Sequence, residues 1–342
     1  MSAAEQLVVL RFSAMGDVAM VASVLKELTA QNPQLKVLMV SRKNFEPFFS
    51  NINHVSFHPI YPKEQHKGFL GLYRLFKELS NYKVVALADL HDNIRSRILS
   101  LFFRLAGVKI KRIDKGRAEK KALTKTTNKI LQPLKLTVER YADVFRALQL
   151  PLQLSHRLHK QERQLPQKAL SFFKNDAKKI GIAPFAQHSY KMYPLEKMGQ
   201  VIGLLIASGY QVFIFGGGDK EFGIAEGWTK QFPTLINTIK QFNLNEELDI
   251  ISHLDLMLSM DSSGMHMASL VGTPVVSIWG PTHPYAGFLG YGQSINDCLQ
   301  IDHPDRPNSI YGNKPCLCGA EECIAMITPE MVIDKINEKL NG

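Results

Sequence analysis

Several familiar signals are missing from the 342-residue sequence. No run of 18 apolar residues occurs, so a membrane-spanning helix is not expected. The apolar stretch Leu7–Phe12 is too short for the core of a signal peptide. Low-complexity runs are also absent, and a content of 45% hydrophobic and 21% charged residues is typical of globular proteins. We therefore expect a folded, cytoplasmic protein.

Cysteine is scarce and confined to residues 298–323. The four cysteines are Cys298, Cys316, Cys318 and Cys323, so disulfides cannot frame the whole fold. The order Cys316-Leu317-Cys318 followed by Cys323 misses the paired C-x-x-C spacing of common zinc sites. Zinc binding remains an alternative, but the spacing favours reduced thiols in a loop. No metal ligands are expected.

Two further absences limit the chemistry. The sequence has no G-x-G-x-x-G, so the fingerprint of dinucleotide-binding proteins is lacking. It also has no D-x-D, the acidic pair that could hold a divalent metal beside a diphosphate. We therefore expect no bound cofactor and a mechanism that needs no metal.

What the sequence does contain is a recurring pattern of buried strand, polar loop and amphipathic helix. Apolar strand segments are expected at Leu7–Phe12, Val37–Val40, Val55–Ile60, Val84–Leu90, Ile180–Phe185, Val212–Phe215, Leu254–Met260 and Val275–Trp279. The pattern predicts an α/β fold with two Rossmann-like domains, and the chain length fits two domains. Because periodicity breaks at Leu150–Pro166, the expected domains are residues 1–165 and 166–342.

Charge is distributed unevenly between these halves. Residues 1–165 hold 28 Lys and Arg against 13 Asp and Glu, giving +15, whereas residues 166–342 hold 13 against 18, giving −5. A basic half favours an anionic partner, with a solvated basic surface as the alternative. The densest basic run, residues 109–125, has little aromatic interleaving, so it suits phosphate contacts rather than stacking on nucleic-acid bases. No nucleic-acid partner is expected.

The stretch from Asp255 to His283 predicts an anion site. The expected strand Leu254–Met260 ends in Asp261-Ser262-Ser263-Gly264, and apolar residues then follow at helical spacing until Gly272-Thr273-Pro274. The N-terminus of such a helix offers unpaired N–H groups to an anion. Simple helix capping is the alternative for the Asp or either Ser. Capping alone does not explain His266 or the polar loop Gly280-Pro281-Thr282-His283.

These motifs carry a family resemblance. The segment Asp261–His266, with Gly272-Thr273-Pro274 and Trp279-Gly280-Pro281-Thr282 downstream, resembles the carboxyl-domain signature of glycosyltransferase family 9, the ADP-heptose:lipopolysaccharide heptosyltransferases. RFSAMGDVAMVASVLKEL is similar to the amino-terminal motif of that family, and APFA…K…YP to the entry of its second domain. Where the family has Gly, this chain has Ser263, and we expect Gly264 to supply the permissive backbone.

The resemblance implies a GT-B fold, with two Rossmann-like domains facing across a cleft, and an inverting, metal-independent transfer of heptose from ADP-heptose to a lipopolysaccharide core acceptor. Asp17 matches the family's proposed catalytic base, with helix capping as the alternative. Implied donor contacts are Lys191, Glu221, Asp261, Ser262, Ser263, Gly264, Met265 and His266. Implied acceptor contacts are Ser13, Gly16, Asp92, Arg95, Lys120 and Lys121. Peripheral contact with the cytoplasmic face of the inner membrane is also expected.

Other functions remain open at this stage. Glu221 could accept ribose hydroxyls or cap the following helix, and His266 could bind a phosphate or merely pack. A hexosyltransferase of the same fold could use another nucleotide sugar. A non-catalytic basic module could dock anionic lipid or nucleic acid, although the presence of both Asp17 and Lys191 argues against it.

Overall fold

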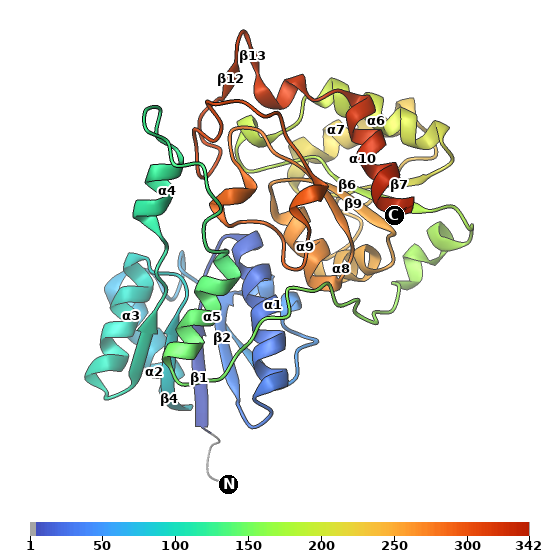
Figure 1. The fold of residues 1–342 in the computed structure, drawn as a ribbon. Coiled ribbons are helices and arrows are strands. Elements are labelled where there is room, and N and C mark those ends of the chain that lie inside the picture. Colours follow the sequence, from blue (N-terminus) through green and yellow to red (C-terminus); the bar gives the residue numbers. More distant parts are fainter. Residues whose placement is uncertain (1–4, 342) are drawn as a thin grey trace. The chain divides into compact units, whose positions relative to one another are not determined.

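A computed structural model describes residues 5–341, which form two compact units. One unit comprises residues 5–115 and 137–155, and the other comprises residues 116–136 and 156–341. The chain passes between the units three times, where the sequence predicted a single boundary at 165/166. Each unit contains a parallel sheet with helices packed on it (Figure 1).

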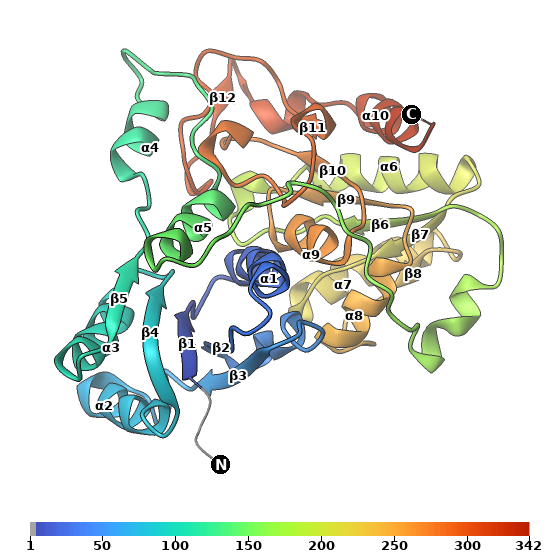
Figure 2. The same cartoon turned by 60° about the horizontal axis from the view of Figure 1, so that its bottom comes forward.

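The first unit is built on a five-stranded parallel sheet in the order β3-β2-β1-β4-β5 (Figure 2). The strands are β1 (Glu5–Leu10), β2 (Val37–Arg42), β3 (Val55–Ile60), β4 (Lys83–Asp89) and β5 (Lys109–Arg112). Leu7 to Leu10 of the central strand β1 are fully or almost fully buried. Such a continuous apolar strand is typical of parallel sheets, because helices cover both faces.

Helices cover both faces of this sheet. They are α1 (Met15–Gln31), α2 (Gly68–Leu79), α3 (Ile94–Leu105) and α5 (Thr137–Ala147), with a 3-10 turn η1 (Lys43–Phe48). On one face, Leu75 of α2 and Leu99 and Phe103 of α3 join the strands in one core. Helices α1 and α5 contact each other on the opposite face (Figure 2).

The second unit is built on a six-stranded parallel sheet in the order β11-β10-β9-β6-β7-β8. Its strands are β6 (Lys179–Ala183), β7 (Gln211–Ile214), β8 (Ile236–Asn237), β9 (Leu256–Met260), β10 (Val275–Ile278) and β11 (Cys298–Leu299). The central strands β6 and β9 pair directly, with Ala183 beside Ser259. Segments that follow these two strands therefore emerge at the same edge of the sheet.

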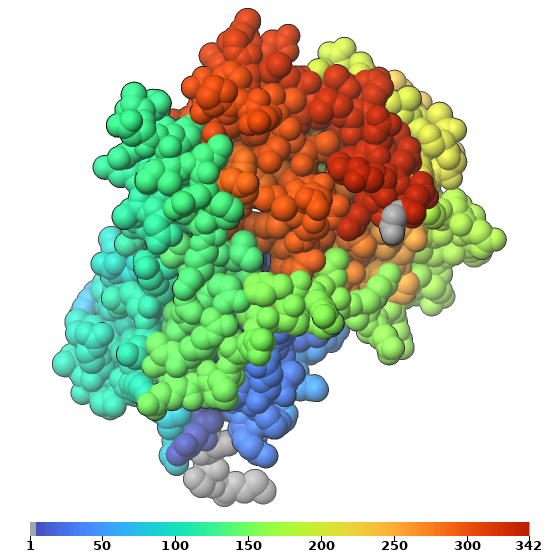
Figure 3. Space-filling view, in the orientation of Figure 1, coloured from blue at the N-terminus to red at the C-terminus, as the bar shows by residue number. Residues whose placement is uncertain are grey.

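The helices of the second unit include the last one in the chain. They are α4 (Arg117–Leu123), α6 (Leu195–Ala207), α7 (Gly218–Gln231), α8 (Leu244–Ser252), α9 (Ser263–Val271) and α10 (Pro329–Asn341). As expected for Thr before Pro at a helix start, Thr328 Oγ1 accepts from the Met331 N–H at 3.3 Å. Helix α10, coloured red, lies at the surface of this unit (Figure 3) and buries Val332 and Ile336. Within residues 5–341, no helix is long and apolar enough to cross a membrane.

A small antiparallel hairpin, β12 (Leu317–Cys318) and β13 (Glu321–Glu322), precedes the 3-10 turn η6 (Cys323–Met326). Cys318 and Cys323 form a disulfide across this hairpin. The expectation of reduced thiols was therefore wrong for these two residues, because the hairpin brings together cysteines that the linear spacing does not pair. Cys298 and Cys316 are free thiols.

Candidate active site

In the second unit, strand β9 leads directly into the expected anion site. Ser262 is the N-cap of α9, its backbone is extended, and its side chain makes no capping hydrogen bond. Ser262 and Ser263 are half-buried, and the Ser262 hydroxyl lies 3.4 Å from that of Ser259. Because the Ser262 side chain does not accept a hydrogen bond from the first turn of α9, the N–H groups of that turn are available to an anion.

Gly264 has a different role from the one expected. It lies within α9 rather than in the left-handed region, so it does not supply a permissive backbone in place of the family's glycine. A Cβ at this position would lie 2.4 Å from the Cβ of Ala183 and 3.0 Å from Oγ of Ser259. Glycine is needed because the start of α9 packs directly against the end of β6 and on β9.

Lys191 and Asp261, both expected to bind the donor, form an ion pair. Lys191 ends the 3-10 turn η3 (Ser189–Lys191) after β6, and Asp261 follows β9. The Lys191 Nζ lies 2.8 Å from Asp261 Oδ2, and their side chains are only 15% and 7% exposed. The structure thus places a partly buried cation at the loop that starts α9.

The polar loop after β10 adds a buried hydroxyl to this region. Thr282 is fully buried, and its Oγ1 has no hydrogen-bond partner among the described residues. A Cβ on Gly312 would lie 2.2 Å from Lys191 Cγ and 3.5 Å from Thr282 Cγ2. The Lys191 and Thr282 side chains therefore both lie close to Gly312. An anion bound at Lys191 could also accept a hydrogen bond from the buried Thr282 hydroxyl.

Two expected donor residues on α9 have buried side chains. Met265 is fully buried and His266 is 6% exposed. The Met265 side chain therefore packs in the core, and only its backbone N–H can contribute to anion binding.

His283, after β10, is also buried, and its Nδ1 accepts from the Tyr285 N–H at 3.1 Å. Burial, reinforced by Arg306, lowers the pKa of His283 to about 4, so its ring is neutral at pH 7.

Glu221 is positioned as a helix cap. Helix α7 begins at Gly218, so Asp219 to Glu221 form its first turn. The Glu221 carboxylate accepts from the Gly217 N–H at 2.6 Å. The structure bears out the capping alternative for Glu221, and its contact with a ribose stays a prediction.

In the first unit, Asp17 lies in the first turn of α1, and polar groups contact both of its carboxylate oxygens. Its Oδ2 lies 2.5 Å from Arg11 Nη2 and accepts from the Ala14 N–H at 3.3 Å. Its Oδ1 accepts from the Tyr141 hydroxyl at 3.5 Å. Burial, with a contribution from Asp17, raises the pKa of Tyr141 well above its ordinary value, so this hydroxyl stays protonated. Asp17 therefore caps α1 and forms an ion pair with Arg11.

The other expected acceptor residues near Asp17 are accessible. Ser13 lies in the loop between β1 and α1, Gly16 lies in the first turn of α1, and both are half-buried. Phe12, which precedes them, donates its N–H to His91 Nδ1 at 2.9 Å. Burial, followed by the charges of Arg11 and Lys115, lowers the pKa of His91 to about 3.

The two acceptor residues expected after β4, Asp92 and Arg95, differ in how accessible their side chains are. The Asp92 side chain is 4% exposed and lies 2.7 Å from Arg97 Nη2, while Arg112 pairs mainly with the buried Asp89. Arg95 is exposed on the first turn of α3, and its side chain makes no hydrogen bond or ion pair with another described residue. Arg95 can reach a ligand directly, whereas the Asp92 carboxylate is held in a structural network.

Lys120 and Lys121 belong to α4, which is part of the second unit rather than the first. Lys120 is 8% exposed, and its ammonium lies 4.2 Å from the ring centroid of Phe288. The expectation of an open basic surface was wrong for Lys120, because an aromatic ring more than 160 residues downstream covers it. Lys121 is exposed.

Sequence reasoning missed Arg11, Tyr141 and Arg306. Arg11 directly follows β1, so its position after a strand was a usable signal. Tyr141 reaches Asp17 from α5, more than 120 residues away, and no local pattern predicts that contact. Arg306 is buried and donates to the carbonyl oxygens of Gly280, Trp279 and Thr282. It therefore supports the loop that carries Thr282.

Comparison with known proteins decides the family. The model of "Glycosyltransferase family 9 (heptosyltransferase)" matches residues 72–311, more than half of the chain. The chain belongs to glycosyltransferase family 9. This family 9 enzyme is 27% identical over 288 residues to "Lipopolysaccharide core heptosyltransferase OpsX" of Haemophilus influenzae, covering 82% of the chain and 81% of that relative. It is 28% identical over 170 residues to "Lipooligosaccharide heptosyltransferase 2" of the same organism, an alignment that covers 47% of each chain.

Solved structures support the fold of the glycosyltransferase. The family 9 glycosyl transferase from Veillonella parvula superposes with a TM-score of 0.74 at 18% identity, covering 100% of this chain and 98% of that one. The E. coli heptosyltransferase WaaC with ADP superposes with a TM-score of 0.68 at 18% identity, covering 98% and 99%. The predicted α/β, GT-B class with two Rossmann-like domains is confirmed.

Proposed function

We propose that this glycosyltransferase moves heptose from ADP-heptose to a lipopolysaccharide core acceptor, with inversion at the anomeric carbon. The relative that it matches over 82% of its length is named a lipopolysaccharide core heptosyltransferase. The observation that carries the proposal is the partly buried Lys191 beside the uncapped start of α9, because a diphosphate needs a cation and free N–H groups.

The donor diphosphate displaces Asp261 from Lys191. The cation then pairs with phosphate, while the first-turn N–H groups of Ser263 to Met265 and the Thr282 hydroxyl donate to phosphate oxygens. These groups stabilise the charge that accumulates on ADP as the bond to the sugar breaks. The chain thus supplies its own positive charge to the leaving group, in keeping with a metal-independent transfer.

On the acceptor side, Asp17 is the proposed base. It takes the proton of the acceptor hydroxyl while that oxygen forms the new bond to the anomeric carbon, and the bond from this carbon to the phosphate oxygen breaks. Arg11 stabilises the ionised carboxylate, the form that a base requires, and the Tyr141 hydroxyl holds its second oxygen. Ser13, Gly16 and Arg95 are the proposed acceptor contacts.

We place the peripheral membrane contact on α2 and α3 rather than on α4. The two helices lie side by side (Figure 2). Both expose large apolar side chains. These are Phe69, Leu70, Tyr73, Ile94, Leu101 and Leu105, each at least 44% exposed. The helices carry five Lys or Arg and one Glu, so an anionic phospholipid surface complements both their charge and their apolar residues. We call this the α2/α3 surface.

Binding and turnover of nucleotide sugars test the proposal. Calorimetry should show ADP binding at least tenfold more tightly than UDP or GDP, and only ADP-heptose should yield free nucleotide diphosphate in the presence of heptose-free lipopolysaccharide core. A protein that binds UDP or GDP best would instead be a transferase for another sugar. One that binds no nucleotide would fit the basic docking module.

A further inference from the structure

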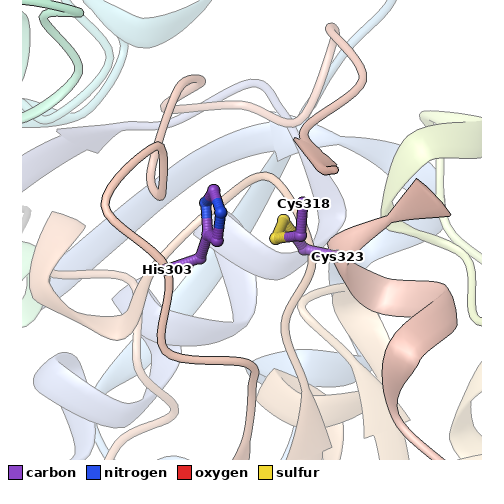
Figure 4. A group of neighbouring side chains, drawn as sticks. All are labelled: His303, Cys318 and Cys323. Carbon is purple, nitrogen blue, oxygen red and sulfur yellow. A yellow bond between two sulfur atoms is a disulfide. The ribbon is translucent and has the colours of Figure 1, made fainter. Parts of the chain in front are cut away.

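Four potential metal ligands that the proposed transfer does not use converge in the second unit. The ligand atoms of His303, Cys318 and Cys323 all lie within 4.8 Å of one another. Figure 4 shows the imidazole of His303 beside the two sulfur atoms. A third thiol completes the group, because Cys316 Sγ lies 3.6 Å from Cys323 Sγ. Among the described residues, His303, Cys318 and Cys323 are the one set of His, Cys, Asp or Glu side chains with ligand atoms this close together, and Cys316 lies next to that set.

The backbone explains why the three sulfurs meet. In the β12–β13 hairpin, Cys318 pairs with Glu321, and the Cys323 N–H donates to the Cys316 carbonyl at 2.8 Å. Cys316 and Cys318 are two residues apart and so share one face of their strand, and Cys323 lies opposite Cys316. Gly319, at φ +79°, makes the tight turn. His303 comes from a separate loop, which the linear spacing of the cysteines cannot reveal.

The surroundings suit an anionic metal centre. Three thiolates and one neutral imidazole around a divalent ion carry a net charge of −1. Charges of both signs act on Cys316, the cations Arg306 and Lys129 and the carboxylates of Asp305 and Glu322. Lys129 also donates to the Pro304 carbonyl at 2.7 Å. Arg306 is 2% exposed, yet it forms no ion pair with a carboxylate within the part of the chain described. A buried guanidinium of this kind is stabilised by a neighbouring negative centre.

We propose that His303, Cys316, Cys318 and Cys323 bind a zinc ion in a closed tetrahedral site when the thiols are reduced. A four-ligand Cys₃His set is typical of structural zinc, and it leaves no position for a substrate. The disulfide is then the metal-free, oxidised form. A dithiol reductant gives two electrons and two protons to Cys318 and Cys323 and itself becomes a disulfide. Zinc then replaces the protons of the three thiols.

Such a site would fix the segment next to the candidate donor site. Arg306, three residues after His303, donates to Gly280 and Thr282, and Gly312 contacts the stem of Lys191. Zinc at the four ligands would therefore hold the chain between His303 and Cys323 against the loop after β10. This consequence rests on the proposed function, whereas metal binding itself does not.

Metal analysis of the full chain, purified with a dithiol reductant, tests the site. We expect about one equivalent of zinc per chain by mass spectrometry, and replacement by Co²⁺ should give a thiolate-to-cobalt charge-transfer band. Cys316→Ser and His303→Gln should each weaken zinc binding at least tenfold, since losing even a hydrogen-bond partner of a metal ligand typically costs about 10- to 100-fold. Cys298→Ser is the matched control and should keep full occupancy, because Cys298 lies outside the cluster.

Folding failure in a variant does not decide the result, since the wild-type protein can be stripped with a chelator and titrated with Co²⁺. The proposal is overturned if the reduced, folded wild type carries no stoichiometric zinc and gives no cobalt–thiolate band. It is also overturned if Cys298→Ser loses zinc as fully as Cys316→Ser does. Failure to bind ADP with zinc in place would count against the proposed function alone.

Discussion

The ammonium of Lys191 lies 2.8 Å from a carboxylate oxygen of Asp261, and both side chains are largely buried. Each residue follows a central strand of the second sheet, so the parallel pairing of β6 and β9 brings them together. A buried pair is costly to break, because the remaining partner keeps an uncompensated charge. Asp261 therefore fixes the position of the Lys191 side chain in the absence of a bound anion.

Removing this cation should weaken nucleotide binding. We expect Lys191→Ala to raise the Kd for ADP about 10- to 150-fold, since losing a hydrogen bond to a charged group costs about 1.5 to 3 kcal/mol. Lys240→Ala is the matched control, because Lys240 forms an exposed ion pair with Asp219 and should leave the Kd unchanged. Calorimetry showing equal ADP affinity for Lys191→Ala and wild type would remove Lys191 from the donor site.

Gly264 tests the close packing beneath the anion site. Gly264→Ala would place a Cβ 2.4 Å from Ala183, so the start of α9 must move. We expect a loss of about 1 to 3 kcal/mol in the free energy of unfolding, together with weaker ADP binding. Gly223→Ala in α7 is the control, since nothing lies within 4 Å of its added Cβ, and it should stabilise the protein by about 0.5 to 1 kcal/mol. Urea denaturation that ranks the two variants in the opposite order would contradict this packing argument.

These two positions show what sequence reasoning can and cannot reach. The strand pattern predicted most strands of both sheets but missed β5, β8 and β11. Lys191 and Asp261 were named through the family resemblance, and each follows a strand that the pattern predicted. The role of Gly264 was missed, since close approach of α9 to Ala183 depends on tertiary packing rather than on local conformation. Lys120 was misjudged for the same reason, because Phe288 covers it. The contact of Tyr141 with Asp17 depends on where α5 returns to the sheet, which no local pattern encodes.

The α2/α3 surface should bind anionic membranes. We expect Leu70→Glu with Leu105→Glu to reduce binding to phosphatidylglycerol vesicles at least tenfold, because burying one such side chain contributes roughly 1.5 to 3 kcal/mol at most. Leu204→Glu is the control, since Leu204 is 40% exposed on α6 of the other unit. In a vesicle sedimentation assay, binding that is equal for all variants, or equal on neutral phosphatidylcholine, would argue that this surface does not contact lipid.

Acid should destabilise the protein through His91. Its folded pKa of about 3 lies below the ordinary value of 6.5, because burial disfavours the charged ring. Below pH 6.5, His91 is therefore protonated in the unfolded chain, whereas in the folded chain it stays neutral down to about pH 3. The free energy of unfolding falls as pH decreases across this window. For His91 the loss between pH 7.5 and 5 is roughly 2 kcal/mol. Urea denaturation of His91→Gln should show a shallower decline over this interval, and an unchanged slope would exclude His91 as a source.

Heptose transfer by wild-type protein and by Asp17→Asn is the most direct test of the account. Asn caps a helix as well as Asp does, so the variant should keep its fold and its ADP affinity. Mass spectrometry of a heptose-free lipopolysaccharide core incubated with ADP-heptose should show one added heptose for each ADP released by the wild type. The rate for Asp17→Asn should be lower by at least about a hundredfold, the smaller effect typical of losing a positioned base. No heptose addition by wild-type protein that binds ADP-heptose, or full activity in a folded Asp17→Asn variant, would contradict the mechanism.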